Sequence, residues 1–113
     1  MLEPSLYVYR AKVIRVVDGD TLDLAVDLGM EVTKSTRVRL IGINCPETNT
    51  PEGKQAKAYV EAWCLSNPEV LIHTTKDRKE KYGRYLATVV SPGITGQTLN
   101  QLLLEVGLAV HYA

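Results

Sequence analysis

The chain has 113 residues, and 45% of them are apolar, which is enough for the core of one compact domain. Its 13 lysines and arginines are balanced by 13 aspartates and glutamates, which argues against a protein that holds nucleic acid by bulk charge alone. No apolar run is long enough to span a membrane, and residues 1–5 do not begin a signal peptide. We therefore expect one domain over residues 6–113 behind a frayed segment 1–5, in a cytoplasmic monomer without membrane contact.

The first half of the chain has the residue pattern of β-strands. Tyr7 to Val17 is rich in β-branched and aromatic residues, which predicts the first strand. Asp18-Gly19 is a hairpin signal, because glycine tolerates the positive φ of tight turns. Thr21 to Leu28 alternates apolar and polar residues and predicts the second strand. We expect Gly29 to Ser35 to be a connection and Thr36 to Ile43 to be the third strand.

The second half begins with a change of period. From Gln55 onward the apolar residues recur on one face of a helix, which Asn67-Pro68 ends. Alternation then returns in a fourth strand around Ile72 and a fifth strand from Arg84 to Val90.

A second helix is predicted near the end of the chain. Thr98 and Gln101 have capping-box spacing, and Gly107 is placed as the C-terminal cap. The whole order predicts an α+β fold that is mainly β. Within this class, the order predicts a five-stranded oligonucleotide-binding (OB-fold) barrel, with one helix between strands three and four and a C-terminal helix.

Polar residues are placed to converge at one rim of this barrel. Arg39 lies within the third strand, and Glu47 follows its end just after Pro46. If strands two and three are neighbours, Asp20 and Asn44 gather at the same rim, and oxygen ligands of this kind suit a hard cation such as Ca²⁺. The alternative is a turn aspartate that caps its own backbone and a solvated arginine.

A basic stretch between strands four and five is the second candidate feature. Residues 76–84 carry five lysines and arginines against two acidic residues. The stretch is either a solvated loop or a phosphate-binding loop, in which Tyr82 offers a stacking face and Arg84 forks onto phosphate oxygens.

Four motifs occur in an order that is typical of one family. They are Val17-Asp18-Gly19-Asp20-Thr21, Arg37-Val38-Arg39-Leu40 through Pro46-Glu47, Lys81-Tyr82-Gly83-Arg84 and Val106-Gly107-Leu108-Ala109. On this succession of strands and helices, from about Tyr9 to Tyr112, the chain resembles staphylococcal nuclease (thermonuclease) homologues. The resemblance implies a Ca²⁺-dependent nuclease that hydrolyses phosphodiester bonds of DNA, RNA or both.

The resemblance also implies a role for each residue that matches a motif. Glu47 would be the general base for an attacking water, and Arg39 and Arg84 would clamp the phosphate. The implied metal ligands are Asp20, Asn44 and the backbone carbonyl of Cys45. The implied nucleotide contacts are Lys81, Tyr82 and Tyr112.

Two departures from the family pattern leave an alternative open. Asn44 stands where the family usually has aspartate, which should weaken Ca²⁺ binding, and Cys45 stands where threonine is usual. A nuclease-like module that binds nucleic acid or a protein partner without cleaving it is therefore the alternative. A generic barrel that serves only as an assembly subunit leaves the ordered motifs unexplained.

Overall fold

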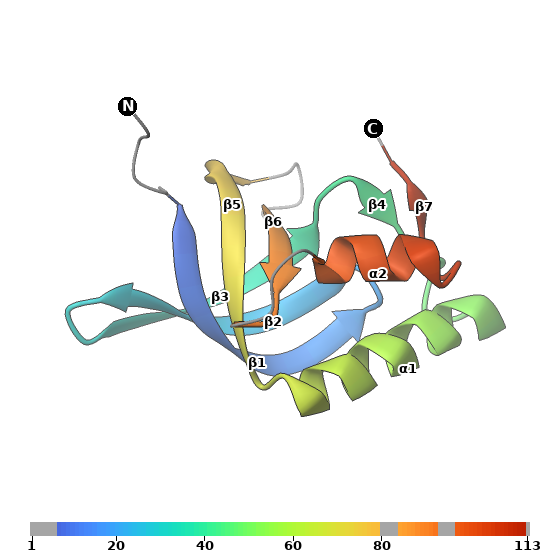
Figure 1. Cartoon of the computed structure of the whole chain (residues 1–113), viewed down its shortest axis with the longest axis horizontal. Coiled ribbons are helices and arrows are strands. Elements are labelled where there is room, and N and C mark those ends of the chain that lie inside the picture. The colour runs from blue at the N-terminus through green and yellow to red at the C-terminus, as the bar shows by residue number, and fades with distance from the viewer. Residues whose placement is uncertain (1–6, 80–83, 93–96, 113) are drawn as a thin grey trace.

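Five strands form a closed barrel in the order β1-β2-β3-β6-β5, and β5 pairs back onto β1 (Figure 1). The computed structural model describes residues 7–79, 84–92 and 97–112, with the side chains of residues 75–79 excepted. The neighbouring strands are antiparallel except for β3 and β6, which are parallel. The barrel strands are β1 (Val8–Asp18), β2 (Thr21–Gly29), β3 (Val32–Leu40), β5 (Glu69–Lys79) and β6 (Tyr85–Val90). The predicted five-stranded barrel is confirmed.

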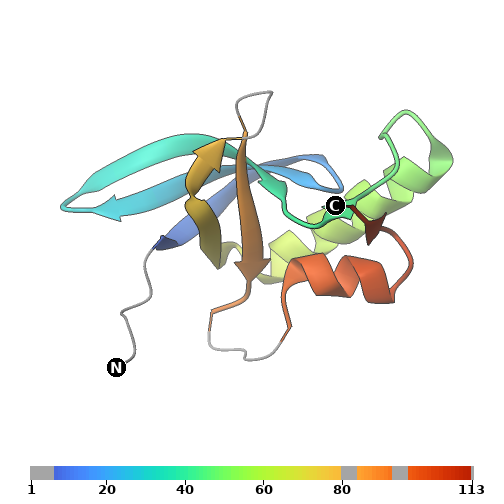
Figure 2. The ribbon, with the colours of Figure 1, turned by 90° about the horizontal axis from the view of Figure 1, so that it is seen from above.

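The barrel is filled by the inward residues of the alternating strands. Leu22 and Leu24 of β2 and Leu40 of β3 are completely buried, as the period of two requires. Helix α1 (Pro51–Ser66) lies between β3 and β5 in the chain and buries Val60 against the same core. Both helices lie on one side of the barrel, and the β2–β3 hairpin extends on the other (Figures 1 and 2).

The β2–β3 hairpin is longer than the sequence predicts. Residues 32–35 belong to β3, so the predicted connection from Gly29 to Ser35 is wrong. Met30 and Glu31 form the turn with φ values of 54° and 65°, and Gly29 pairs with Val32 across it. A two-residue turn with both φ values positive matches the twist of the strands it joins. Met-Glu is not a usual sequence for such a turn, which is why the alternation alone did not reveal it.

The third strand also ends earlier than predicted. β3 stops at Leu40, and Gly42 turns the chain with a φ of 80°, a conformation that favours glycine. Ile43 therefore belongs to a separate short strand, β4 (Ile43–Asn44), which pairs with β7 (Val110–His111) in a second sheet. This small sheet was not predicted, and it brings the end of the chain to the end of β3.

The helices begin where capping residues place them. α1 starts at Pro51, before the predicted Gln55, because the Thr50 hydroxyl accepts the Gly53 N–H and proline occupies the first turn. α2 (Leu99–Glu105) has the predicted capping box, and Gly107 follows it with a φ of 79°. Within the part of the chain that the structure describes, no helix is long and apolar enough to cross a membrane.

Candidate active site

A cleft of about 1090 Å³ lies at one rim of the barrel, where β2 begins and β3 ends. Seven residues that the sequence singled out line this one cleft. They are Asp20, Arg39, Asn44, Cys45, Glu47, Arg84 and Tyr112. The other two predicted nucleotide contacts, Lys81 and Tyr82, lie outside the described residues.

The pairing of β2 with β3 brings Asp20 and Arg39 together. Thr21 is directly opposite Arg39 in the register, and the Leu40 N–H donates to the Asp20 carbonyl at 2.8 Å. Val38 and Leu40 point into the core, so the alternation turns the Arg39 side chain outward into the cleft. The spatial convergence that the sequence predicted therefore follows from strand register.

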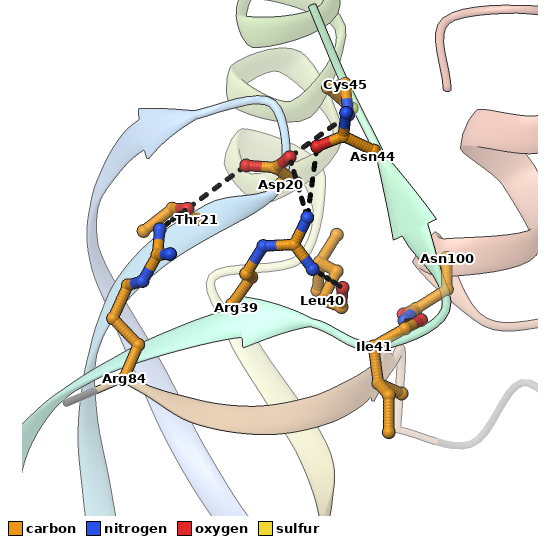
Figure 3. Close-up of polar contacts among 9 residues, drawn as sticks. All are labelled: Asp20, Thr21, Arg39, Leu40, Ile41, Asn44, Cys45, Arg84 and Asn100. Atoms are coloured by element: carbon orange, nitrogen blue, oxygen red, sulfur yellow. Dashed lines mark hydrogen bonds and ion pairs between the residues drawn. The ribbon is translucent and has the colours of Figure 1, made fainter. Parts of the chain in front are cut away.

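The Arg39 guanidinium contacts both side chains predicted as metal ligands, Asp20 and Asn44 (Figure 3). Its Nη2 donates to Asn44 Oδ1 at 3.0 Å and lies 3.8 Å from Asp20 Oδ2. The Arg39 and Asp20 side chains are 11% and 10% exposed. An ion pair this shielded from water is screened less by salt than one on an open surface.

The Asp20 carboxylate is held by two further donors. The Cys45 backbone N–H donates to Oδ2 at 3.0 Å, and the Thr21 hydroxyl donates to Oδ1 at 3.1 Å. The first bond ties the start of β2 to the segment after β4, so Asp20 fixes the position of the residues that lead to Glu47. Asp20 and Cys45 each lie in one of the motifs, but no other feature of the sequence predicts that they form a hydrogen bond.

Arg84 reaches the cleft because β6 pairs in parallel with β3. Leu86 lies opposite Arg39 in that pairing, and Arg84 immediately precedes β6. Its Nη1 donates to the Thr21 hydroxyl at 3.3 Å (Figure 3). Thr21 thus accepts from Arg84 while it donates to Asp20. It is 1% exposed, and sequence reasoning did not identify it as part of the site.

Glu47 lines the cleft from a loop that is anchored at several points. Its carbonyl accepts the Thr50 N–H at 3.0 Å and the Thr50 hydroxyl at 2.7 Å. The Thr48 hydroxyl donates to the Asp18 carboxylate at the β1–β2 turn. Gly53 of α1 packs so tightly beneath the loop that a Cβ there would lie 1.7 Å from the Glu47 carbonyl oxygen. These contacts hold the backbone of Glu47, the candidate general base, in place, although its side chain is exposed.

Tyr112 covers the Arg39 side chain from the small β4–β7 sheet. The Arg39 guanidinium carbon lies 4.9 Å from the centre of the Tyr112 ring, a cation–π contact. The Tyr112 N–H donates to the Gly42 carbonyl at 2.9 Å, which holds the aromatic residue next to the turn after β3. With 56% exposure, the ring presents much of its surface to solvent.

Asn100 makes hydrogen bonds to the backbone of the turn after β3 and of β6. Its role was not predicted from the sequence. This α2 residue is 5% exposed. Its amide nitrogen donates to the Ile41 carbonyl at 2.9 Å and the Ala87 carbonyl at 3.3 Å, and its oxygen accepts the Val89 N–H at 3.2 Å. The available sequence signal was a lone asparagine beside Leu99 on an apolar helix.

Cys45 is a protonated thiol at neutral pH. Burial and the neighbouring Asp20 carboxylate raise its pKa to about 12, against a smaller opposing effect of Arg39. A thiol nucleophile needs a thiolate, so the structure gives Cys45 no nucleophilic role.

The donors that converge in the cleft suit a hard cation in type but are few in number. Asp20 supplies a carboxylate and Asn44 an amide oxygen, which are ligands of the kind that Ca²⁺ takes. Across residues 7–79, 84–92 and 97–112, no group of three or more histidine, cysteine, aspartate or glutamate side chains could hold a metal ion. The donor types of Asp20 and Asn44 thus fit Ca²⁺, and two further carboxylates, those of Asp18 and Glu47, line the same cleft.

Residues 37–113, more than half of the chain, match the staphylococcal nuclease homologue family. The chain belongs to this family. The matched region starts at Arg37 in β3 and includes Arg39, Glu47 and Arg84, so the side chains that line the cleft lie largely inside it.

Several relatives of this nuclease homologue have names that refer to nucleases. A thermonuclease from Staphylococcus hyicus is 38% identical over 104 residues, which cover 87% of this chain and 56% of the relative. An uncharacterized endonuclease from Escherichia coli is 30% identical over 101 residues, with 89% and 60% covered. A micrococcal nuclease from Shigella flexneri is 29% identical over 115 residues, with 96% and 62% covered. The chain thus spans less than two thirds of the length of these relatives.

Proposed function

We propose that this staphylococcal nuclease homologue hydrolyses phosphodiester bonds of DNA, RNA or both. The observation that carries the proposal is that Arg39 of β3 and Arg84, which immediately precedes β6, line the same cleft as Glu47. The names of the relatives support the same reaction.

The residues supply what hydrolysis of a diester requires. A phosphodiester anion repels water, and its negative charge grows in the transition state. Two guanidinium groups stabilise that charge by charge-assisted hydrogen bonds to phosphate oxygens. Glu47 takes the proton of the attacking water as general base. Tyr112 stacks on the bound nucleotide, and Lys81 and Tyr82 complete the nucleotide contacts.

Ca²⁺ is the cofactor that we propose, with Asp20, Asn44 and the backbone carbonyl of Cys45 as its ligands. When bound, the ion supplies positive charge to the phosphate and to the water. Because ligand charge sets affinity, one carboxylate predicts weak binding that needs high metal concentration. In the structure, Arg39 contacts Asp20 and Asn44. When substrate binds, the Arg39 guanidinium exchanges these contacts for phosphate oxygens.

The direct test is cleavage of single-stranded DNA and RNA with Ca²⁺ and with EDTA. Glu47→Gln is expected to lower kcat by at least about 10²-fold, the lower range of what a positioned general base contributes, with unchanged circular dichroism. The matched control is Glu61→Gln, an exposed α1 residue outside the cleft, which is expected to keep full activity. Near wild-type turnover in Glu47→Gln removes this residue from the mechanism.

The second candidate function is a module that binds nucleic acid or a protein partner without cleavage. The observation that favours it is Asn44, whose amide oxygen accepts a hydrogen bond from Arg39 where an aspartate would carry a full charge. The same assay separates the two functions. Binding of the oligonucleotide without any cleavage, at every Ca²⁺ concentration, supports the module and refutes the enzyme.

A further inference from the structure

Two more arginines lie outside the cleft, on the outer surface of β1, β2 and β3. Arg37 of β3 contacts Asp23 of β2 through Nε at 2.7 Å and through Nη2 at 3.1 Å. Arg15 of β1 contacts the same carboxylate through Nε at 3.3 Å. The side chains of Arg37 and Arg15 are 46% and 63% exposed. Neither residue lines the cleft, and the proposed reaction assigns them no role.

Strand register places these arginines in line with the cleft. Arg39 lies opposite Thr21 and Arg37 lies opposite Asp23, so both arginines are on the outer face of β3, two residues apart. Two residues along a strand advance about 6.6–6.8 Å. Arg15 also lies opposite Asp23, but in β1, the strand that pairs with the other edge of β2. The positive groups therefore continue from the cleft across the face of the sheet as a short row.

The arginines of this row share few acidic partners and remain partly exposed. Two guanidinium groups share one carboxylate, and the hydrogen bond from Arg37 lowers the pKa of Asp23, which keeps it ionised at neutral pH. Asp23 and, through its charge, Asp18 raise the pKa of the Arg37 guanidinium. The two positive charges are therefore balanced by two carboxylates, but both guanidinium groups stay partly exposed and can meet a phosphate. A single arginine opposite Asp23 would already provide a cross-strand ion pair, so the second one adds guanidinium donors beyond what pairing with Asp23 needs.

We propose that Arg37 and Arg15 bind a second phosphate group of the nucleic acid chain, beyond the phosphate held by Arg39 and Arg84. The proposal rests on the proposed function in one respect, that the cleft holds a phosphate of the same chain. Guanidinium groups fork onto phosphate oxygens, and an extended strand that leaves the cleft along β3 presents its next phosphates to them. Asp23 competes with that phosphate for both arginines.

The test measures binding of a single-stranded oligonucleotide at several salt concentrations, with EDTA present so that cleavage does not interfere. Arg37→Gln and Arg15→Gln are each expected to weaken binding and to reduce the slope of log K against log salt by about 0.7 for each phosphate that the variant no longer neutralises. Asp23→Asn is expected to tighten binding. The matched control is Arg10→Gln, an exposed arginine near the start of β1 that lies opposite Leu71, with no expected change. Unchanged affinity and slope in both arginine variants overturn the proposal.

A dinucleotide, which occupies only the cleft, distinguishes this subsite from the active site. Its cleavage by Arg37→Gln and Arg15→Gln is expected to equal that of the wild type, and an equal reduction on dinucleotide and oligonucleotide overturns the second phosphate position. A purely structural ion pair predicts that Asp23→Asn lowers the melting temperature without tighter binding, which also overturns it. If the wild type binds through Arg37 but cleaves nothing, the subsite stands and the proposed hydrolysis fails.

Discussion

The guanidinium of Arg39 contacts the Asn44 amide oxygen, the Asp20 carboxylate and the ring of Tyr112 at once. A planar group with several donors can do this, whereas the ammonium of lysine is a single charged point. We therefore expect Arg39→Lys and Arg84→Lys each to lower kcat/KM for DNA cleavage by roughly 10²-fold although the charge is kept.

Steady-state kinetics with Arg10→Lys as the control checks this prediction. A change in KM alone would mean that the arginines bind substrate and transition state equally. Wild-type kinetics in both variants would refute the phosphate clamp.

Asn44 is one of the two residues at which this chain differs from the pattern that the resemblance implies, and its replacement is the most informative single change. In Asn44→Asp a full charge joins that of Asp20, so we expect tighter Ca²⁺ binding and cleavage at lower Ca²⁺ concentration. The added charge also repels the phosphodiester, so the gain in turnover is expected to be smaller than the gain in affinity. Calorimetry beside a Ca²⁺ titration of activity measures both. If neither protein binds Ca²⁺ or cuts nucleic acid, the catalytic proposal fails.

At the level of elements, α2 supports the cleft through one buried side chain. Asn100 joins the turn after β3 to β6 by three hydrogen bonds. Asn100→Ala removes the side-chain partner of the Ile41 carbonyl and of the Val89 N–H, at a cost of about 1–3 kcal/mol for each group left unsatisfied. The Ala87 carbonyl, in contrast, still accepts the Ile41 N–H at 2.9 Å. Urea unfolding should show this destabilisation, with little change in the exposed α1 control Gln55→Ala. A variant as stable as the wild type would show that water replaces the amide.

The loop that carries Glu47 gives a second prediction at this scale. Alanine normally stabilises a helix relative to glycine by about 1 kcal/mol, but a Cβ at Gly53 would lie 1.7 Å from the Glu47 carbonyl oxygen. Gly53→Ala is therefore expected to lower the melting temperature and kcat together, because the loop has to move. Thermal unfolding and kinetics of the same preparation test this. Higher stability with full activity would mean that the loop does not position Glu47.

Local patterns predicted most elements, and the misses have physical causes. Alternation predicted the strands, and the Thr98 capping box was confirmed in full. Met30 and Glu31 take positive φ values because the strand pairing imposes them, which no local residue preference reveals. The break at Gly42 is visible as a glycine, but its consequence, the pairing of β4 with β7, depends on the distant end of the chain.

The candidate site was predictable where motifs carried it. The convergence of Asp20, Arg39 and Asn44 followed from assuming that strands two and three are neighbours. The contributions of Thr21 and Asn100 were missed because a buried hydrogen bond has no spacing rule in sequence.

Across the whole molecule, zero net charge coexists with a local row of arginines on one face. The interior, in contrast, holds two uncharged thiols that ionise only at high pH. Burial raises the pKa of Cys45 to about 12 and that of Cys64 to about 11, from an ordinary value of 9.0. Both cysteines are free and buried, so we expect thiol reagents to react slowly with the native protein and rapidly after unfolding.

These pKa values also predict how stability depends on pH. A folded pKa above the unfolded value means that the unfolded chain loses its protons first, so alkaline solution favours unfolding. The contribution of Cys64 is complete below pH 9.0 and disappears as the pH rises from there to about 11. We expect the free energy of unfolding to fall over this interval, and to fall less steeply in Cys64→Ala, which has no thiol at this position. Urea titrations of both proteins at several pH values measure the two slopes. Since the two proteins differ only in the Cys64 thiol, equal slopes would mean that the folded structure does not hold the Cys64 proton.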